Sequence, residues 1–412
     1  MTGHHRWVVM LVGAVLVFGR LAAARPQSDT DTLEQGRYLA SAGNCVSCHS
    51  TPHGPPFAGG VAFHTPLGTI YSTNITPDTE TGIGLWSETD FIRALHDGVR
   101  ADGRRLFPAF PYTSFTKITD QDAKALYRYL RTLEPVRYAP PGNGILFSQR
   151  WVMRFWNAMW FKSQRYVQVA GRSAEWNRGA YLSEALGHCD ACHTPRNMMM
   201  AEIPRRAYTG GQLREKVADD SYRLWSSVNL TPSSTGIGSW SVEEVARYLK
   251  TGFSQRGGAF GPMDDVILNS TRNLSDDDLH AVAVYLKSLP AQATAVTLKP
   301  TDSEIKAGET IYTQYCAQCH VASGRGGLFS GPRLAGSAVV QAPDPASLIN
   351  IILYGPDPPA ALQGAEPHWE TMDPYKEILS DEQVAAVSNF VRNSWGNRGD
   401  SVTSGEVARQ RE

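Results

Sequence analysis

All six cysteines of the chain fall into three copies of one five-residue pattern, Cys-x-x-Cys-His. The copies are Cys45-Val46-Ser47-Cys48-His49, Cys189-Asp190-Ala191-Cys192-His193 and Cys316-Ala317-Gln318-Cys319-His320. This is the pattern that attaches haem c, because two thiols can bond to vinyl groups on one porphyrin edge while the next imidazole lies beneath the ring and binds iron. The sequence therefore predicts three covalently bound haem c groups, with His49, His193 and His320 as proximal iron ligands.

Other uses of cysteine fit this spacing less well. Oxidising compartments favour disulfides, but no cysteine lies outside the repeated pattern. A structural zinc site needs four nitrogen or sulfur ligands, and each cluster supplies three without a matching fourth nearby. A redox dithiol does not need a histidine after its cysteine pair. Only 11 of the 412 residues are histidine, so the chance that a histidine follows all three cysteine pairs at random is on the order of 10⁻⁵. Haem attachment is the favoured interpretation.

Haem iron in an electron-transfer cytochrome usually has a methionine thioether as its second axial ligand. Met263 follows Gly261-Pro262, and Met372 precedes Asp373-Pro374; both lie in Gly/Pro-containing segments before a predicted helix. We therefore predict that Met263 and Met372 complete the second and third iron sites. A ligating imidazole normally donates its other N–H to an oxygen. Pro332, twelve residues after His320, resembles the position whose carbonyl fills that role in small cytochromes c, so this resemblance implies Pro332 as the acceptor for His320.

The first copy of the pattern has no methionine between His49 and its closing helix. Phe110, which cannot bind iron, occupies the place of Met263. The remaining candidates are His53, His64 and His96, and for each of them an ordinary surface histidine is the favoured interpretation. We expect the first iron to be either five-coordinate or bound by His96, which lies on a predicted helix.

Each cysteine pattern is preceded by a helix that contains glycine and followed by an acid-capped amphipathic helix. The closing helices are predicted at Asp120 to Leu133, Asp276 to Leu289 and Asp381 to Trp395. A glycine at 36, 179 or 308 lets a second helix cross closely, and an aromatic residue of the closing helix (Tyr129, Tyr285 or Phe390) can fill the angle between them. This pairing is typical of cytochrome c and predicts an all-α fold of three tandem cytochrome c domains.

The expected domains cover residues 25–135, 166–290 and 303–397, with an amphipathic segment at 136–165, a linker at 291–302 and a polar tail at 398–412. The first two domains look like a duplication, because Asn74-Ile75-Thr76-Pro77 recurs as Asn229-Leu230-Thr231-Pro232. These asparagines match the glycosylation sequon, but their repetition favours side chains that donate to haem propionates.

The segment from Ile145 to Lys162 is rich in aromatic residues and also carries Arg150, Arg154 and Lys162. Such a helix could lie on a membrane or on a quinone-bearing partner. Packing between two haem domains is the commoner arrangement for a single amphipathic helix, and we favour it.

The N-terminus predicts export. His4, His5 and Arg6 precede an apolar run from Trp7 to Phe18, and small residues follow at 22–24, so that residues 1–24 read as a cleaved signal peptide. Arg20 leaves an uncleaved anchor as the alternative. Cleavage would remove two of the 39 basic residues and none of the 40 acidic ones, giving 37 − 40 = −3; this balance gives no indication of nucleic-acid binding.

Three further stretches carry a family resemblance: Gly68 to Asp78, Leu186 to Arg196 and Ser394 to Asn397. With the cysteine patterns, they make the chain similar to the triple-haem cytochrome c subunits of membrane-associated bacterial dehydrogenases, of the alcohol, gluconate, sorbitol and fructose types, and to relatives that serve molybdenum hydroxylases. The chain departs from many relatives at Phe110, where they have methionine, and at the polar Asp400 to Glu412, where several have a membrane-binding helix.

The resemblance implies a non-catalytic electron-transfer subunit in the periplasm, at the outer face of the inner membrane. It implies electron flow from a catalytic flavin, quinoprotein or molybdenum subunit to ubiquinone or a terminal oxidase, and a complex that sometimes includes a small third subunit. The alternative is a self-sufficient haem enzyme or ligand-binding sensor that uses the first haem. The relay is favoured, because no acid–base pair is evident near Phe110.

Overall fold

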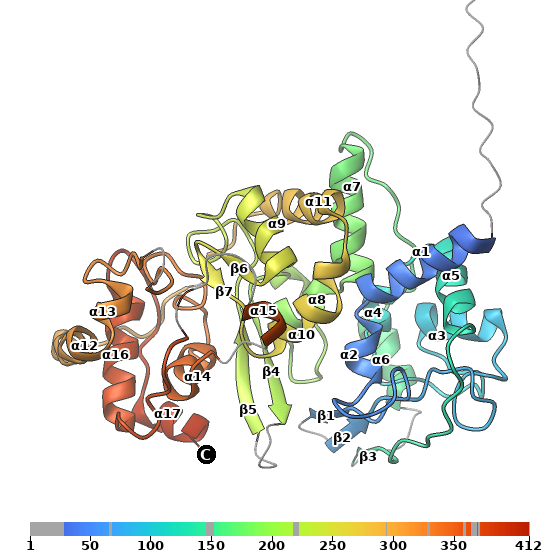
Figure 1. Ribbon diagram of the computed structural model, residues 1–412, viewed down its shortest axis with the longest axis horizontal. Coiled ribbons are helices and arrows are strands. Elements are labelled where there is room, and N and C mark those ends of the chain that lie inside the picture. Colours follow the sequence, from blue (N-terminus) through green and yellow to red (C-terminus); the bar gives the residue numbers. More distant parts are fainter. Residues whose placement is uncertain are drawn as a thin grey trace, which may run out of the picture.

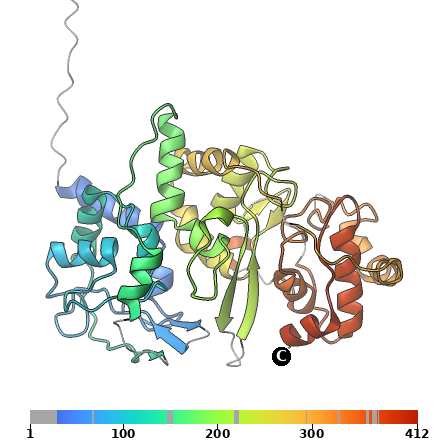
Figure 2. The same ribbon diagram turned by 180° about the vertical axis from the view of Figure 1, so that it is seen from behind.

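The structure is a computed structural model that describes residues 29–411 except 66–67, 146–151, 217–221, 294, 328–329, 357–359, 364–368 and 370. The expected signal peptide lies outside the described residues. Three successive units follow one another along the long axis of the molecule, each built around one pair of crossed helices (Figures 1 and 2).

The first unit contains α1 (Asp29–Ala42), α2 (Cys45–His49), β1 (Ala62–Thr65), β2 (Gly68–Tyr71), α3 (Glu88–Asp97), α4 (Tyr112–Phe115), α5 (Asp120–Leu130) and β3 (Gly144–Ile145). Helix α6 (Val152–Trp160) follows it. The second unit contains α7 (Ala174–Tyr181), η1 (Leu182–Leu186), α8 (Cys189–His193), η2 (Pro204–Arg206), β4 (Gly211–Lys216), β5 (Tyr222–Ser227), α9 (Val242–Thr251), β6 (Phe253–Ser254), β7 (Gly257–Gly258), α10 (Pro262–Asn269), η3 (Thr271–Asn273) and α11 (Asp276–Lys287). The third unit contains α12 (Asp302–Tyr315), α13 (Ala317–His320), α14 (Ala346–Tyr354), α15 (Ala360–Gln363), α16 (Asp381–Asn393) and α17 (Ser404–Arg411).

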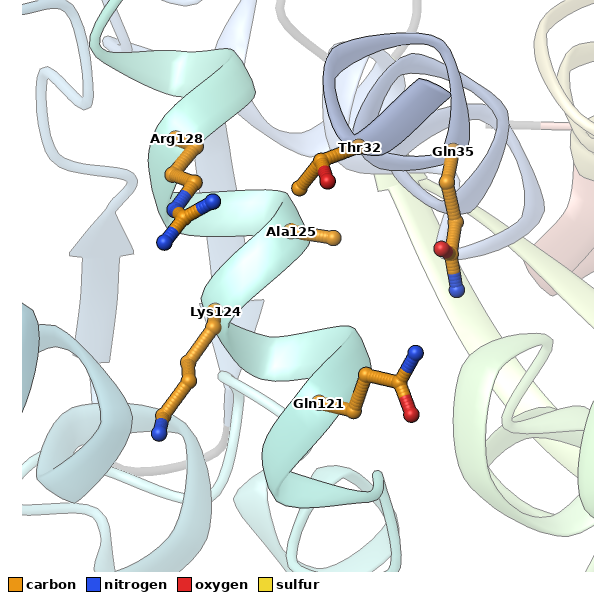
Figure 3. Close-up of a pocket in the computed structure, with 6 residues that line it drawn as sticks. All are labelled: Thr32, Gln35, Gln121, Lys124, Ala125 and Arg128. Carbon is orange, nitrogen blue, oxygen red and sulfur yellow. The ribbon is translucent and has the colours of Figure 1, made fainter. Parts of the chain in front are cut away.

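The three helix crossings depend on glycine, as predicted. A Cβ added at Gly36, Gly179 or Gly308 would overlap a backbone carbonyl of the facing helix. It would also lie 2.6, 3.0 and 2.7 Å from the Cβ of Tyr129, Tyr285 and Phe390, respectively. Figure 3 shows the outer side of the α1–α5 crossing, where an open hollow is lined by Thr32, Gln35, Gln121, Lys124, Ala125 and Arg128. Glycine thus lets the two backbones touch, and the aromatic side chain packs beside the contact.

The closing helices α5, α11 and α16 begin where the sequence predicts. Their N-caps are Thr119, Ser275 and Ser380, whose side chains accept a hydrogen bond from the backbone N–H three residues later. Acidic side chains in the first turn add a favourable interaction with the helix dipole.

The expectation of an all-α fold is corrected by short antiparallel strands. β1, β2 and β3 form one sheet, and β4 pairs with β5 from Gly211↔Ser227 to Lys216↔Tyr222. These hairpins fill the long connections between a Cys-x-x-Cys-His turn and the next helix. Strand pairing satisfies the backbone donors and acceptors that an irregular connection of this length would leave unpaired.

The first and second units share a core and a reciprocal set of contacts. One apolar cluster includes Leu39 and Leu126 from the first unit together with Leu186 and Leu279 from the second. The Tyr38 hydroxyl of α1 donates to Asp278 of α11 at 2.6 Å, and the Tyr181 hydroxyl of α7 donates to Asp122 of α5 at 2.5 Å. Each tyrosine stands two residues after its helix-crossing glycine, so the two contacts are equivalent under the internal repeat.

The third unit has its own core and attaches to the β5 strand of the second. The Ser226 N–H donates to the Ser347 hydroxyl at 2.9 Å, and the Ser347 N–H donates to the Ser226 hydroxyl at 3.1 Å. Ser404–Arg411 of the expected polar tail form α17, whose Val407 is fully buried in the core of the third unit. Gln410 also donates to the Leu224 carbonyl of the second unit at 2.8 Å. The tail therefore belongs structurally to the third unit.

Candidate haem sites

Each Cys-x-x-Cys-His pattern forms one short helical turn directly after the first helix of its unit. α2 and α8 span the whole pattern, whereas in the third unit Cys316 is the residue that precedes α13. All six thiols are free. In the described part of the chain, no group of three or more His, Cys, Asp or Glu side chains is arranged to hold a metal ion. Each turn instead presents two thiols beside one imidazole, as thioether attachment of haem requires.

The three proximal histidines use one ring nitrogen in the same way. Nδ1 of His49, His193 and His320 lies 2.6, 2.7 and 2.9 Å from the carbonyl oxygens of Thr73, Val228 and Pro332, respectively. Because a carbonyl only accepts, Nδ1 carries the proton and Nε2 keeps its lone pair for a metal. Burial lowers the pKa of all three imidazoles, although each hydrogen bond opposes this change, so that the rings are neutral as ligation requires. The donor set therefore fits haem iron.

The predicted acceptor in the third unit is confirmed, since Pro332 provides the carbonyl for His320. Sequence reasoning missed the acceptors in the other two units. Thr73 and Val228 stand directly before the repeated Asn-x-Thr-Pro segments, and this position was the signal that could have identified them.

The predicted role of Asn74 and Asn229 as donors to haem propionates is wrong. The Asn74 side-chain amide donates to the Val136 carbonyl at 2.7 Å and to the Thr81 hydroxyl at 3.0 Å. The Asn229 amide donates to the Gln292 carbonyl at 2.7 Å in the equivalent place. Both asparagines are almost completely buried, so their hydrogen bonds join parts of the protein to one another.

The first two attachment turns lie close together. Burial raises the pKa of Cys48 to about 11, and the charges of Cys192 and Asp265 in the second unit add to this effect. The Asn269 amide donates to the Ser47 hydroxyl at 2.9 Å, and the Ser114 hydroxyl donates to Asp190 at 3.2 Å. Each attachment turn therefore contacts the neighbouring unit.

Met263 lies in the first turn of α10, rather than in an irregular segment as expected. Pro262 occupies an early helical position, where its fixed φ favours a helix start. Gly261 has a φ of 56°, and a Cβ there would lie 2.9 Å from the indole ring of Trp225. Trp225 on β5 therefore supports the turn that carries Met263, a role that the sequence did not reveal.

Met372 lies in a segment without regular secondary structure that packs on the core of the third unit. A Cβ at Gly355, which ends α14 with a φ of 74°, would lie 2.7 Å from the Met372 carbonyl oxygen. The next turn is attached to α14, because the Tyr375 N–H donates to the Ile352 carbonyl at 3.0 Å. The position of Met372 is thus fixed relative to α14, and its role as a ligand stays a prediction.

The candidates in the first unit occupy separate places. Phe110 packs against Phe115 with ring centroids 5.3 Å apart. His53 is exposed in a turn. His64 on β1 is hydrogen-bonded to the Thr69 hydroxyl at 2.9 Å, and its ring centroid lies 4.4 Å from that of Tyr222. The structure does not bring these side chains together.

His96 is fully buried on α3. Its Nδ1 lies 3.7 Å from a carboxylate oxygen of Asp120, at the start of α5. Burial and, secondarily, the positive charge of Arg165 lower the pKa of His96 to about 4. The side chain of His96, which belongs to α3, therefore lies near the start of α5 and near the segment after α6. Its role as the first iron ligand stays a prediction.

The packing interpretation of the interdomain segment is confirmed for its described part; residues 146–151 lie outside the described residues. The Trp156 indole of α6 donates to the Met199 carbonyl of the second unit at 2.9 Å. Tyr112 of the first unit donates to Asn157 at 2.6 Å. Phe155 and Met159 are 62% and 58% exposed. Among the described residues, no helix is both long and apolar enough to cross a membrane.

Crossed helices followed by Cys-x-x-Cys-His turns with anchored histidines define a c-type cytochrome, and the family model for cytochrome c matches residues 33–134 and 305–395. The gluconate 2-dehydrogenase cytochrome c subunit of Pantoea cypripedii is 39% identical over 95% of this chain and 93% of its own length. The cytochrome c subunit of the quinone alcohol dehydrogenase of Gluconacetobacter polyoxogenes is 37% identical over 96% and 88%. The fructose dehydrogenase cytochrome subunit of Gluconobacter japonicus is 34% identical over 96% and 87%. The chain belongs to this family of dehydrogenase cytochrome c subunits.

Proposed function

We propose that the chain is an electron-transfer subunit with three cytochrome c domains, each holding one covalent haem c. The observation that carries this proposal is the threefold repetition of a cysteine pair next to a histidine whose Nδ1 is occupied by a backbone carbonyl. Bound haem supplies a one-electron ferric/ferrous couple. The two thiols of each turn would attach the porphyrin, and the histidine would hold the iron.

Met263 and Met372 complete the second and third sites in this proposal. A thioether is a soft ligand that favours ferrous iron and raises the reduction potential. Trp225 and Gly355 support the segments that carry the two methionines. The hydrogen bonds of Ser47 with Asn269 and of Asp190 with Ser114 hold each attachment turn against the other unit, which favours direct electron exchange between the first and second sites.

The relatives suggest the partners. A catalytic dehydrogenase subunit with flavin, quinoprotein or molybdenum chemistry would donate electrons, and ubiquinone or a terminal oxidase would accept them. We place the complex in the periplasm at the outer face of the inner membrane, where a small third subunit and peripheral membrane contact would complete it. The exposed face of α6, with Phe155 and Met159, supports such a contact.

The haem count is the direct test. Denaturing electrophoresis with haem staining should show haem bound to the full-length chain, and a pyridine haemochrome assay should give three haems per chain. Purification of a tagged chain from its own host should recover a dehydrogenase subunit with it. Any other haem count would overturn the three-domain assignment, and an isolated chain would count against the partner.

A second candidate function is a self-sufficient haem enzyme or a ligand sensor. Phe110 favours it, because this residue stands where the other sites place methionine and leaves the first iron without a thioether. Carbon monoxide binding to the reduced protein separates the two: an electron relay with a fully ligated first iron should not bind the gas, whereas a vacant iron should bind one equivalent.

A further inference from the structure

Three buried asparagines recur beside the carbonyls that accept hydrogen bonds from the proximal histidines. Asn74 directly follows Thr73, and Asn229 directly follows Val228. Asn397 lies far from Pro332 in sequence, yet it donates to the carbonyl of Leu334, two residues after Pro332, at 3.0 Å. The three asparagines are 2%, 0% and 4% exposed.

In each unit we call the loop that carries the acceptor carbonyl, at Thr73, Val228 or Pro332, the acceptor loop. In the first unit, Asn74 joins this loop to the segment after the closing helix. Its side-chain oxygen accepts from the Thr76 N–H at 2.9 Å and from the Thr76 hydroxyl at 2.7 Å. Its amide donates to the Val136 carbonyl at 2.7 Å, just beyond α5. These hydrogen bonds of the Asn74 side chain therefore fix the backbone that directly follows the Thr73 carbonyl.

The second unit repeats this arrangement. The side-chain oxygen of Asn229 accepts from the Thr231 N–H at 2.8 Å and the Thr231 hydroxyl at 2.7 Å. The Asn229 amide donates to the Gln292 carbonyl at 2.7 Å, beyond α11. The carbonyl of Val228 is thus fixed in the same way as that of Thr73.

In the third unit, the asparagine that makes this connection lies after the closing helix and not in the acceptor loop. Asn397 lies beyond the closing helix α16 and bonds back to the acceptor loop, where its side-chain oxygen accepts from the Gly336 N–H at 2.7 Å. Its amide also donates to the Val391 carbonyl of α16 at 2.7 Å. Two different chain arrangements therefore produce one connection, between the acceptor loop and the end of the closing helix.

We propose that Asn74, Asn229 and Asn397 are positioning residues that hold the acceptor carbonyls against the proximal histidines and thereby tune the reduction potential of each haem. The proposal rests on the haem ligation proposed above. A hydrogen bond at Nδ1 makes the imidazole a stronger electron donor to the metal, which stabilises ferric iron. Hydrogen-bond strength falls steeply with distance and angle, so a loosened carbonyl weakens this effect. Loss of the asparagine should therefore raise the potential of its own haem.

The test uses the haem-loaded full chain with Asn397→Ser. A spectroelectrochemical titration resolved into three one-electron components should show one component shifted upward, by up to about tenfold in its equilibrium constant or roughly 59 mV for one electron. Asn229→Ser should shift a different component. The other components and the low-spin spectrum should stay unchanged.

Asn389→Ser is the matched control. Asn389 is 2% exposed in the same unit, and its side chain bonds the backbone of Val402, at 2.7 and 3.0 Å, in place of the acceptor loop. The proposal is overturned if Asn389→Ser shifts a potential as much as Asn397→Ser does. It is also overturned if neither Asn397→Ser nor Asn229→Ser shifts a potential. Should Asn397→Ser fail to fold, Asn229→Ser alone decides the proposal, with the same expected upward shift. A wild-type haem count other than three would instead overturn the proposed function.

Discussion

The helix crossing of the third unit offers a sharp test of the packing argument. In Gly308→Ala the new Cβ would overlap the Ala386 carbonyl and lie 2.7 Å from the Cβ of Phe390, whereas carbon atoms in contact normally lie about 3.5–4.0 Å apart. The helices must separate by about 1 Å, and overpacking of this kind costs about 1–3 kcal/mol or more. The better helix propensity of alanine returns up to about 1 kcal/mol. Because the added Cβ would overlap the Ala386 carbonyl oxygen, the cost should be at the upper end of this range, about 2–3 kcal/mol, so the net loss should be about 1–2 kcal/mol.

Thermal unfolding of the haem-loaded chain measures this loss. For a unit of this size each kcal/mol lowers the midpoint by about 4–8 °C, so a decrease of about 5–15 °C is expected for the third unit. Gly405→Ala in α17 is the matched control, because Gly405 is exposed and a Cβ there meets only the end of Arg409 at 3.9 Å. That variant should be as stable as the wild type or slightly more so. Equal midpoints for the two variants would refute the close-packing argument.

Three further predictions concern the iron sites and the interface. Met263→Ala and Met372→Ala should each remove one share of the near-infrared Met-to-iron band and lower one midpoint potential; unchanged spectra in both would remove them from the sites. Phe110→Met should add a third Met-ligated signal in magnetic circular dichroism, and the absence of that signal would contradict the repeat alignment. Burial raises the pKa of Asp278, but hydrogen bonds from Arg178 and Tyr38 outweigh it and the net pKa is lowered. Its charge therefore stabilises the fold above pH about 4 and the benefit is lost as the pH falls through the lower folded value. In urea unfolding, Asp278→Asn should cost about 1–2 kcal/mol at pH 7 and progressively less in acid, and a pH-independent cost would contradict this reasoning.

Local signals in the sequence were sufficient to predict the helical framework. The closing helices start at hydroxyl N-caps followed by acids, and both features act within one helical turn. The helix-crossing glycines were also predictable, because only glycine allows the backbone of Ala125, Ala281 or Ala386 to approach so closely. The acceptor for His320 followed from the resemblance of Pro332 to the position whose carbonyl fills this role in small cytochromes c.

The features that sequence reasoning missed depend on contacts between distant segments. The hairpin of β4 and β5 acquires its role through Trp225, which packs under Gly261 more than thirty residues later. The tail 398–412 looks polar, but Val407 is buried once α17 packs on the third unit. Asn74 was assigned to haem because its motif repeats, whereas its partner Val136 becomes a neighbour only in the folded chain.

The reciprocal contacts of Tyr38 with Asp278 and of Tyr181 with Asp122 have the form of an isologous dimer interface contained in a single polypeptide. In a true homodimer every substitution appears in both subunits, so a change that suits one metal site is imposed on the other. Covalent linkage removes that restriction. The two halves can keep a common interface while their iron environments diverge, and Phe110 in one half beside Met263 in the other is the divergence that such a linked pair permits.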